Sequence, residues 1–262
     1  MTDTILQSID ERGVATLTLN RPEVHNAFDD ALILRLDEAL QFLAADRAVR
    51  AVVLNAAGKS FSAGADLAWM RRMASYTLPE NFADAERLAR LLRTLDRLPK
   101  PTIAVVQGAA YGGGVGLVAC CDVVIAAETA TFCLSEVKLG IIPSVISPYV
   151  VHAIGARQAR RYFITAEAMP AGRAREIGLV HEVVMADALG AALETTLQAL
   201  LQGAPGAQAG AKDLVFLNEA RALDESLVAE TARRIAERRT TDEAKEGFAA
   251  FLEKRKPSWR VG

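Results

Sequence analysis

The stretch that decides the fold is Thr102-Ile-Ala-Val-Val-Gln-Gly-Ala-Ala-Tyr-Gly-Gly-Gly-Val-Gly-Leu117. Its first five residues are largely apolar and rich in β-branched side chains, which predicts a buried strand. The glycines follow, and the apolar segment after them, up to Cys121, has no breaker and predicts a helix start. A strand that ends in glycines and restarts as a helix directs unpaired backbone N–H groups, reinforced by the helix dipole, at whatever lies before it. The stretch therefore indicates an anion or oxyanion site.

One carboxylate, Glu136, lies downstream of this glycine loop among apolar residues. It is the only Asp or Glu between Glu128 and Glu167. The ordinary interpretation is a solvated or capping side chain, since glutamates are mostly exposed. The alternative is a general acid/base, because apolar surroundings would raise the pKa of its carboxyl toward that role. A donor loop with one nearby carboxylate has the minimum parts for proton chemistry beside a developing oxyanion.

Residues 63–66, Ala-Gly-Ala-Asp, share the design of the glycine run at 112–114. Each loop follows a predicted strand, contains almost no side chain and precedes a predicted helix, so that a ligand can approach the backbone closely. Two such loops could each place one N–H on a single carbonyl oxygen. The alternative is that both are tight turns required only for packing, and the spacing alone does not decide between the two.

Strand and helix patterns alternate along the first two thirds of the chain. This alternation predicts an α/β fold with parallel strand pairing and right-handed crossovers. Asn26 or Asp29 is expected to cap the first helix. Beyond about residue 187 the strand pattern ends and only helices are expected. The predicted strands are 14–19, 49–54, 102–106, 121–126 and 180–184, and the predicted helices are 32–46, 66–70, 78–98, 156–166, 173–178, 187–202, 206–221, 223–239 and 242–254.

The composition is that of an ordinary globular protein of 262 residues, with 51% hydrophobic and 24% charged residues. A net charge of −2 and a pI of about 6.0 give no bulk attraction for nucleic acid or an anionic membrane. No segment approaches the ~20 apolar residues of a bilayer span. The first residues are polar and acidic, unlike a signal or transit peptide. We therefore expect a cytoplasmic protein that binds neither nucleic acid nor membrane.

Several familiar site patterns do not fit. Gly58-Lys59-Ser60 resembles the end of a phosphate-binding loop, but the earlier glycine of that pattern would fall at Val53. A dinucleotide fingerprint that starts at Gly112 would need its third glycine at Leu117. The three histidines fit neither a triad nor a zinc site, and the three cysteines lack metal-ligand spacing. No metal and no nicotinamide cofactor is expected.

Three segments together resemble the crotonase superfamily, which contains the enoyl-CoA hydratases and isomerases. They are Phe61–Leu67, Ala109–Leu117 and Ser135–Pro143. The residues Asn20-Arg21-Pro22 with Asn26-Ala27 near the start, and Phe251–Pro257 near the end, extend the resemblance over essentially the whole chain. The ordered set is highly specific, although each piece alone is not.

The resemblance implies a spiral of ββα units over residues 1–186 that carries the active site. It also implies a C-terminal helical region over residues 187–262 that assembles trimers, commonly paired into hexamers. The implied partner is an acyl-CoA thioester substrate. No cofactor is implied, because coenzyme A is part of the substrate.

The resemblance also assigns roles to individual residues. The backbone N–H groups of Ala65 and Gly113 would be the donors of a thioester oxyanion hole, in agreement with the two-loop argument. Glu136 would be the acid/base. The segment Ala63-Gly64-Ala65-Asp66-Leu67 would lie along the acyl and pantetheine part of the substrate. The candidates for the nucleotide phosphates include Lys254 and Lys256.

This chain departs from the two-glutamate pattern of the standard hydratases. The later glutamate corresponds to Glu136, but the earlier one falls on Gly116. One interpretation is a hydratase in which Glu136 alone activates water and returns the proton. The runs Ala65–Met70, Phe132–Glu136 and Val145–Pro148 are most similar to bacterial methylglutaconyl-CoA and carboxygeranoyl-CoA hydratases of leucine and acyclic-terpene breakdown. The other interpretation is a Δ3,Δ2-enoyl-CoA isomerase, a branch that also keeps only the later glutamate.

A hypothesis of a different class is a non-catalytic relative that binds CoA esters or RNA, since Gly116 removes one catalytic group. The balanced charge and the lack of an aromatic-basic pattern argue against RNA. The retained Glu136 in its apolar setting argues against a protein without activity. The sequence therefore favours an enzyme.

Overall fold

The computed structural model describes residues 3–260 and divides into two compact units. The first unit extends to Glu194 except for Pro99–Pro101, and the second comprises Pro99–Pro101 and the chain from Thr195 onward. Both glycine loops and Glu136 belong to the first unit. The helix α7 (Leu189–Gln202) contains the division between the units.

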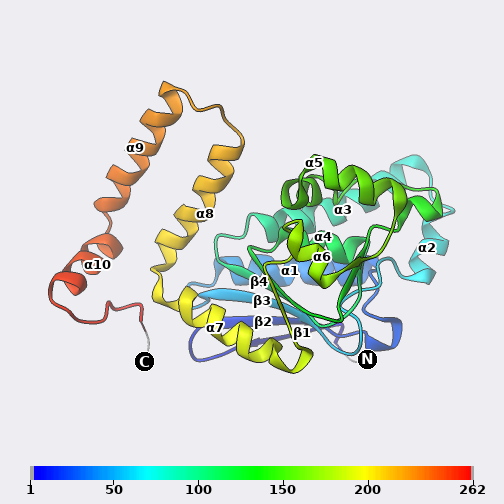
Figure 1. The fold of residues 1–262 in the computed structure, drawn as a ribbon, viewed down its shortest axis with the longest axis horizontal. Helices are drawn as coiled ribbons and strands as arrows, with labels where there is room; N and C mark the ends of the chain where they lie inside the picture. The colour runs from blue at the N-terminus through cyan, green and yellow to red at the C-terminus, as the bar shows by residue number, and fades with distance from the viewer. Residues whose placement is uncertain (1–2, 261–262) are drawn as a thin grey trace. The chain divides into compact units, whose positions relative to one another are not determined.

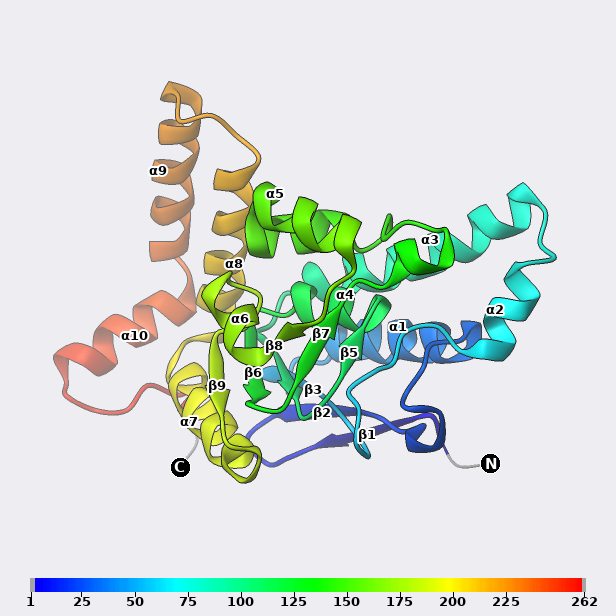
Figure 2. The same cartoon turned by 45° about the vertical axis from the view of Figure 1, so that its right-hand side comes forward.

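Two sheets organise the first unit (Figures 1 and 2). The larger sheet has the strand order β1-β2-β3-β4-β6-β9, and the smaller has the order β5-β7-β8. In the larger sheet β1 pairs antiparallel with β2, whereas the other pairs are parallel, as the alternation of strands and helices predicted. The strands are β1 (Ile5–Ile9), β2 (Val14–Leu19), β3 (Ala51–Ala56), β4 (Thr102–Val106), β5 (Ala110–Tyr111), β6 (Val123–Ala127), β7 (Thr131–Cys133), β8 (Met169–Pro170) and β9 (Glu182–Val184).

The helices of the first unit lie mainly over the larger sheet, where α1, α3, α4 and α5 are stacked (Figures 1 and 2). The predicted apolar face of α1 is confirmed, since Leu32, Ile33, Leu36, Leu40 and Leu43 are all buried. The helices of this unit are η1 (Pro22–Val24), α1 (Asp30–Ala45), α2 (Leu67–Met73), α3 (Leu78–Asp96), α4 (Gly113–Cys120), η2 (Glu136–Leu139), α5 (Ser147–Thr165), α6 (Ala171–Glu176) and η3 (Ala186–Ala188).

Some boundaries differ from those predicted. The strands β1, β5, β7 and β8 were not predicted, because three of them have only two or three residues and β1 has only one buried residue. The helix predicted from residue 156 begins at Ser147. Gly155 interrupts it with φ 74° and ψ 153°, so the pattern revealed only the part after this kink. The helix expected after the glycine run begins earlier, at Gly113.

Asp29, and not Asn26, caps α1, because the Asp29 carboxylate accepts a hydrogen bond from the Leu32 N–H. Asn26 is fully buried and has φ 53°, in the left-handed region that asparagine tolerates. Its Nδ2 donates to the carbonyls of Ala57 and Ser60, each at 2.8 Å, and its Oδ1 accepts from the Arg21 N–H at 2.8 Å. Asn26 therefore ties the loop after β3 to the turn after β2.

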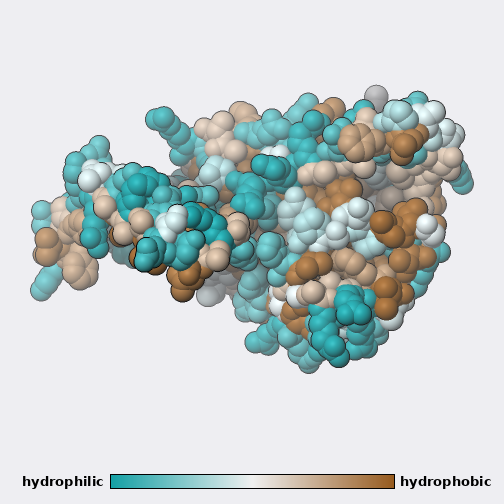
Figure 3. Space-filling model, turned by 90° about the horizontal axis from the view of Figure 1, so that it is seen from above, coloured by the Kyte–Doolittle hydropathy of each residue, from teal (hydrophilic) through white to brown (hydrophobic). Residues whose placement is uncertain are grey.

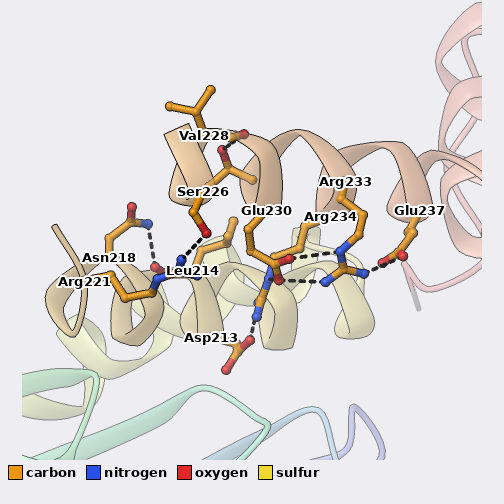
Figure 4. Close-up of polar contacts among 11 residues, drawn as sticks. Asp213, Leu214, Asn218, Arg221, Ser226, Val228, Glu230, Arg233, Arg234 and Glu237 are labelled. Carbon is orange, nitrogen blue, oxygen red and sulfur yellow. Dashed lines mark hydrogen bonds and ion pairs between the residues drawn. The ribbon is translucent and has the colours of Figure 1, made fainter. Parts of the chain in front are cut away.

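The second unit contains four helical segments, as predicted: the end of α7, then α8 (Pro205–Glu219), α9 (Glu225–Arg239) and α10 (Asp242–Leu252). Figure 4 shows that Glu230 pairs with Arg233 and Arg234 within α9, and that Arg234 also pairs with Asp213 on α8. Arg221 donates to Ser226 across the turn between these helices at 2.8 Å.

Apolar side chains also reach the surface of the first unit, and Figure 3 shows several hydrophobic patches on the face seen from above. The exposed apolar residues of α2, α3 and the segment at η2 are Leu67, Leu78, Phe82, Leu139, Ile141 and Ile142. Between residues 3 and 260 no helix is long and apolar enough to cross a bilayer.

The Asn26 contacts predict a specific loss of stability. Asn26→Ala is expected to lower the free energy of unfolding by about 3 kcal/mol, because the Arg21 N–H and the Ala57 carbonyl lose this partner and each buried backbone group left unpaired costs on the order of 1–3 kcal/mol. Chemical denaturation followed by circular dichroism measures this change. The control Asn218→Ala removes an exposed hydrogen bond to the Leu214 carbonyl and should change stability by less than ~0.5 kcal/mol. Equal losses in both variants would contradict the prediction.

Candidate active site

The two small-residue loops, residues 63–66 and residues 112–114, lie against each other. Ser62 and Ala110 form an isolated parallel bridge. The Ser62 N–H donates to the Ala109 carbonyl at 3.0 Å, and the Tyr111 N–H donates to the Ser62 carbonyl at 2.8 Å. The structure therefore brings together the two loops that share a small-residue composition in the sequence.

The loops and the carboxylate meet at Gly112. Gly64 and Gly112 have φ of 91° and 50°, which favours glycine at both positions. A Cβ built at Gly112 would lie 3.3 Å from Glu136 Oε1 and 3.9 Å from the Gly64 Cα. A side chain at position 112 would therefore displace the carboxylate and crowd the first loop.

The N–H groups of Ala65 and Gly113 have no hydrogen-bond acceptor within the described part of the chain. Gly113 is the first residue of α4, so no carbonyl of a preceding turn is available to it. Ala65 is bridged to Phe28, and the hydrogen bonds of that parallel bridge are made by its neighbours, Gly64 and Asp66. The N–H of Ala65 itself therefore points away from Phe28. Both donors are free to bind a ligand oxygen.

Glu136, at the start of η2, is partly buried beside Gly112. Its Oε2 atom is buried and has no hydrogen-bond partner among residues 3–260. Burial raises the pKa of the Glu136 carboxyl above its ordinary value of 4.5, and a hydrogen bond with its own backbone only partly opposes this. A carboxyl with a raised pKa and an unused oxygen is suited to taking and returning a proton.

Asp66, the other carboxylate beside the loops, is already used by the protein. Its Oδ1 accepts from the N–H groups of Ala68 and Trp69 and so caps α2, while its Oδ2 pairs with Arg21 at 3.0 Å. Burial raises the pKa of the Asp66 carboxyl, but these hydrogen bonds and the charge of Arg21 outweigh it, so the pKa is lowered. Asp66 is therefore ionised and fixed at neutral pH.

An isoleucine occupies the space beside Gly116. A Cβ built at Gly116 would lie 2.4 Å from Ile146 Cγ2 and 3.5 Å from Leu92 Cδ2. Ile146 is buried, with 3% of its surface exposed. Gly116 also follows Gly112 by four residues, so the two lie one turn apart along the start of α4. The position of the missing first glutamate is thus enclosed by apolar side chains.

The remaining predicted site residues lie at the surface. Ala63 is exposed, and Leu67 is 72% exposed at the start of α2. Lys254 and Lys256 are exposed and follow α10 in the second unit. Their predicted contacts with a nucleotide stay a prediction.

The loop that contains Gly58-Lys59-Ser60 is arranged around Gln107. The Gln107 Nε2 donates to the carbonyls of Ala56, Gly58 and Ser60 at 2.9, 3.2 and 3.1 Å. The loop therefore turns carbonyl oxygens, and not a row of N–H donors, toward this side chain. Among residues 3–260 there is no group of three or more His, Cys, Asp or Glu side chains that could hold a metal ion.

Three residues of this site were not identified from the sequence. Phe28 pairs with the first loop, Arg21 pairs with Asp66, and Ile146 lies against Gly116. Arg21 was noted only as part of the Asn-Arg-Pro motif, and Ile146 only within the run Val145–Pro148 of the family resemblance. Their contacts depend on pairings between distant segments, which a single sequence does not encode locally.

Comparison with known proteins identifies the family. Residues 10–261 match the family Enoyl-CoA hydratase/isomerase. A crystal structure of an enoyl-CoA hydratase from Shewanella pealeana is similar with a TM-score of 0.95 and 45% identity, over 98% of this chain and 96% of that one. The crystal structure of an enoyl-CoA hydratase from Mycobacterium smegmatis is similar with a TM-score of 0.92 and 37% identity, over 99% of this chain and 100% of that one.

A sequence relative supports the same family. The enoyl-CoA hydratase ACTT6 of Alternaria alternata is 37% identical over 211 residues, which are 79% of this chain and 67% of that protein. The family match spans nearly the whole chain, and the fold agrees with the crotonase-type architecture expected from the sequence. Membership implies an acyl-CoA substrate. The chain belongs to the enoyl-CoA hydratase/isomerase family and is an enzyme of this class.

Proposed function

We propose that this enzyme hydrates a branched or carboxylated enoyl-CoA, with Glu136 as its single acid/base and the N–H groups of Ala65 and Gly113 as oxyanion donors. The observation that carries the proposal is the unpartnered, buried Oε2 of Glu136 beside two loops with unused N–H groups. The relatives named enoyl-CoA hydratase support hydration as the reaction. No cofactor is needed, because coenzyme A is part of the substrate.

In this mechanism the thioester carbonyl oxygen accepts hydrogen bonds from Ala65 and Gly113. The ionised Glu136 takes a proton from water, and the hydroxide oxygen adds to C3 while the C2–C3 double-bond electrons move toward the thioester. The resulting enolate oxygen is stabilised by both donors, each worth on the order of 3 kcal/mol in comparable sites. Glu136 then returns its proton to C2, so that one water has been added.

The second candidate is a Δ3,Δ2-enoyl-CoA isomerase, and one observation favours it. Ile146 occupies the space that a side chain at Gly116 would need, so a second carboxylate that could orient water is excluded there. In an isomerase Glu136 would remove a proton from C2 of a 3-enoyl thioester and return it to C4. The same two donors would stabilise the dienolate between these steps.

The finer parts of the proposal rest on the resemblance to methylglutaconyl-CoA and carboxygeranoyl-CoA hydratases. Residues 63–67 would lie along the acyl and pantetheine part of the substrate, and Lys254 and Lys256 would contact the nucleotide phosphates. The helical region 187–262 would assemble trimers or hexamers. The exposed small residue Ala63 and the exposed Leu67 support a ligand path along this segment.

A product assay tests the proposed function. The pure protein is incubated with 3-methylglutaconyl-CoA and, separately, with a simple 3-enoyl-CoA, and the products are measured by mass spectrometry. We expect the gain of one water on the first substrate. A double-bond shift without mass change on the second substrate alone would establish the isomerase instead.

The same assay tests the role of Glu136. Glu136→Gln is expected to lower kcat by at least ~100-fold, because general acid/base catalysis contributes on the order of 10²–10⁴, while CoA-ester binding is retained. Glu128→Gln, at an exposed glutamate, is the matched control and should keep wild-type turnover. A Glu136→Gln enzyme with near wild-type rate would contradict the assignment.

The raised pKa of Glu136 predicts the pH dependence. The free enzyme needs the ionised carboxylate, so kcat/KM should fall at acidic pH with an apparent pKa above the ordinary value of 4.5. The same shift favours the protonated carboxyl in the folded state, and this stabilisation is present below 4.5 and lost as the pH rises through the raised pKa. Glu136→Gln should therefore raise the Tm at neutral pH and not below pH 4.5. An acidic limb at or below 4.5 would contradict this.

The contact between Gly116 and Ile146 predicts compensating substitutions. Gly116→Ala should destabilise the protein by ~1–3 kcal/mol through overpacking, since its Cβ would lie 2.4 Å from Ile146 Cγ2. Ile146→Ala removes this methyl group, so Gly116→Ala should cost less stability in the Ile146→Ala protein than in the wild type. Gly172→Ala, where nothing lies within 4 Å, is the control. Strictly additive losses in a denaturation cycle would show that Ile146 does not occupy this space.

A further inference from the structure

Phe28 contacts both candidate donor loops. Its backbone N–H donates to the Gly64 carbonyl at 2.6 Å, and its carbonyl accepts from the Asp66 N–H at 2.7 Å. These two bonds flank Ala65 and fix the direction of the Ala65 N–H, because in a parallel bridge the residue between the bonded groups points its own N–H to the other side. The backbone of Phe28 therefore orients the first donor.

The ring of the same residue packs on the second donor. A Cβ built at Gly113 would lie 2.8 Å from Phe28 Cε2 and 2.9 Å from Cδ2, so the ring lies directly against the Gly113 backbone. Phe28 is 1% exposed, and a buried ring in a close-packed interior has little freedom to move. The ring therefore limits where the first residue of α4 can lie relative to the bridge.

Arg21 holds the segment around Phe28 in place. Its Nη1 donates to the Ala27 carbonyl at 2.8 Å and pairs with Asp29 at 2.9 Å, while its Nη2 pairs with Asp66 at 3.0 Å. Ala27 and Asp29 are the two neighbours of Phe28, and Asp66 is the neighbour of Ala65. Arg21 therefore holds both segments of the Phe28–Ala65 bridge. A substitution that changes only the Phe28 ring should mainly alter the position of Gly113.

We propose that Phe28 is a positioning residue that sets the placement of the Ala65 and Gly113 N–H groups relative to one another. The inference rests on the proposed function, because it takes these two groups as the donors to one thioester oxygen. With 1% of its surface exposed, Phe28 is assigned no contact with the substrate. It acts through its backbone on one loop and through its ring on the other.

A double-mutant cycle tests this coupling. Phe28→Val removes both ring atoms that face Gly113 and should lower kcat by ~10–100-fold with KM changed by less than ~3-fold, because a misplacement near 1 Å costs on the order of 10² in rate. Gly113→Ala should lower kcat by ~100-fold or more, close to the effect of losing one oxyanion donor. In the double variant the valine leaves room for the added methyl group, so the rate should exceed that of Gly113→Ala by ~10-fold.

A binding measurement separates this inference from the reaction itself. Acetoacetyl-CoA is a β-keto thioester whose enolate absorbs in the near ultraviolet, and two aligned N–H donors increase the enolate fraction of the bound form. The wild type should show this absorbance, Phe28→Val and Gly113→Ala should each lose it, and the double variant should regain part of it. This pattern would support the inference even if the enzyme hydrates neither test substrate.

Two controls keep the result specific. Phe163→Val makes the same change at a partly buried ring on α5 and should change neither the enolate absorbance nor kcat by more than ~2-fold, as expected for a substitution away from the site. Phe28→Leu removes less of the side-chain volume than Phe28→Val, and it replaces the valine variant in these measurements if that variant does not fold. Additive losses in the cycle, or unchanged absorbance in the folded Phe28 variant, would overturn the inference. Absence of the enolate absorbance in the wild type would also overturn the inference.

Discussion

The site depends on two isolated backbone bridges, one between Ser62 and Ala110 and one between Phe28 and Ala65. They join three segments that are far apart in the sequence, and they do so with peptide groups because the loops carry almost no side chains. The absence of side chains is what permits the approach, and the hydrogen bonds are what maintain it. The larger sheet and its helices fix the ends of the three bridged segments, and so they determine where the bridges can form.

The two carboxylates beside these loops are treated differently by the protein. Asp66 is paired with Arg21 and capped by backbone N–H groups, and its pKa is lowered. Glu136 has an oxygen without a partner, and its pKa is raised. The difference follows from surroundings and not from residue type, since both are partly buried acids. Of the two, only Glu136 combines a raised pKa with an oxygen that has no partner among the described residues.

Much of the architecture could be predicted from the sequence, because it depends on local patterns. The apolar periodicity identified α1 and α3, an alternating pattern identified β2, and a run rich in β-branched residues identified β4. The strand β5 could not be predicted, since two residues carry no pattern and its pairing with β7 depends on Phe132 and Cys133 further along. Asn26 was one of two residues expected to cap the first helix, because asparagine favours that position; Asp29 is the cap, and the left-handed backbone and buried amide of Asn26 serve a loop instead.

The candidate site was predicted in part. Small-residue composition pointed to both loops, and an isolated acid among apolar residues pointed to Glu136. Phe28 and Ile146 were not predicted to matter, because an apolar side chain has no chemistry to reveal its role. What they do follows from contacts with Gly113 and Gly116, and those contacts exist only in the folded chain.

The burial of the Glu136 Oε2 atom limits how a proton bound there can exchange with bulk water. An atom with almost no solvent contact and no hydrogen-bond partner offers a bound proton no direct route to bulk water. If Glu136 is the acid/base, a proton taken up on this atom during turnover would reach the substrate before it exchanges with bulk water. In a hydration the hydrogen delivered to C2 would then come from the water molecule that was added, and in an isomerisation the hydrogen removed from one carbon would be the hydrogen delivered to the other.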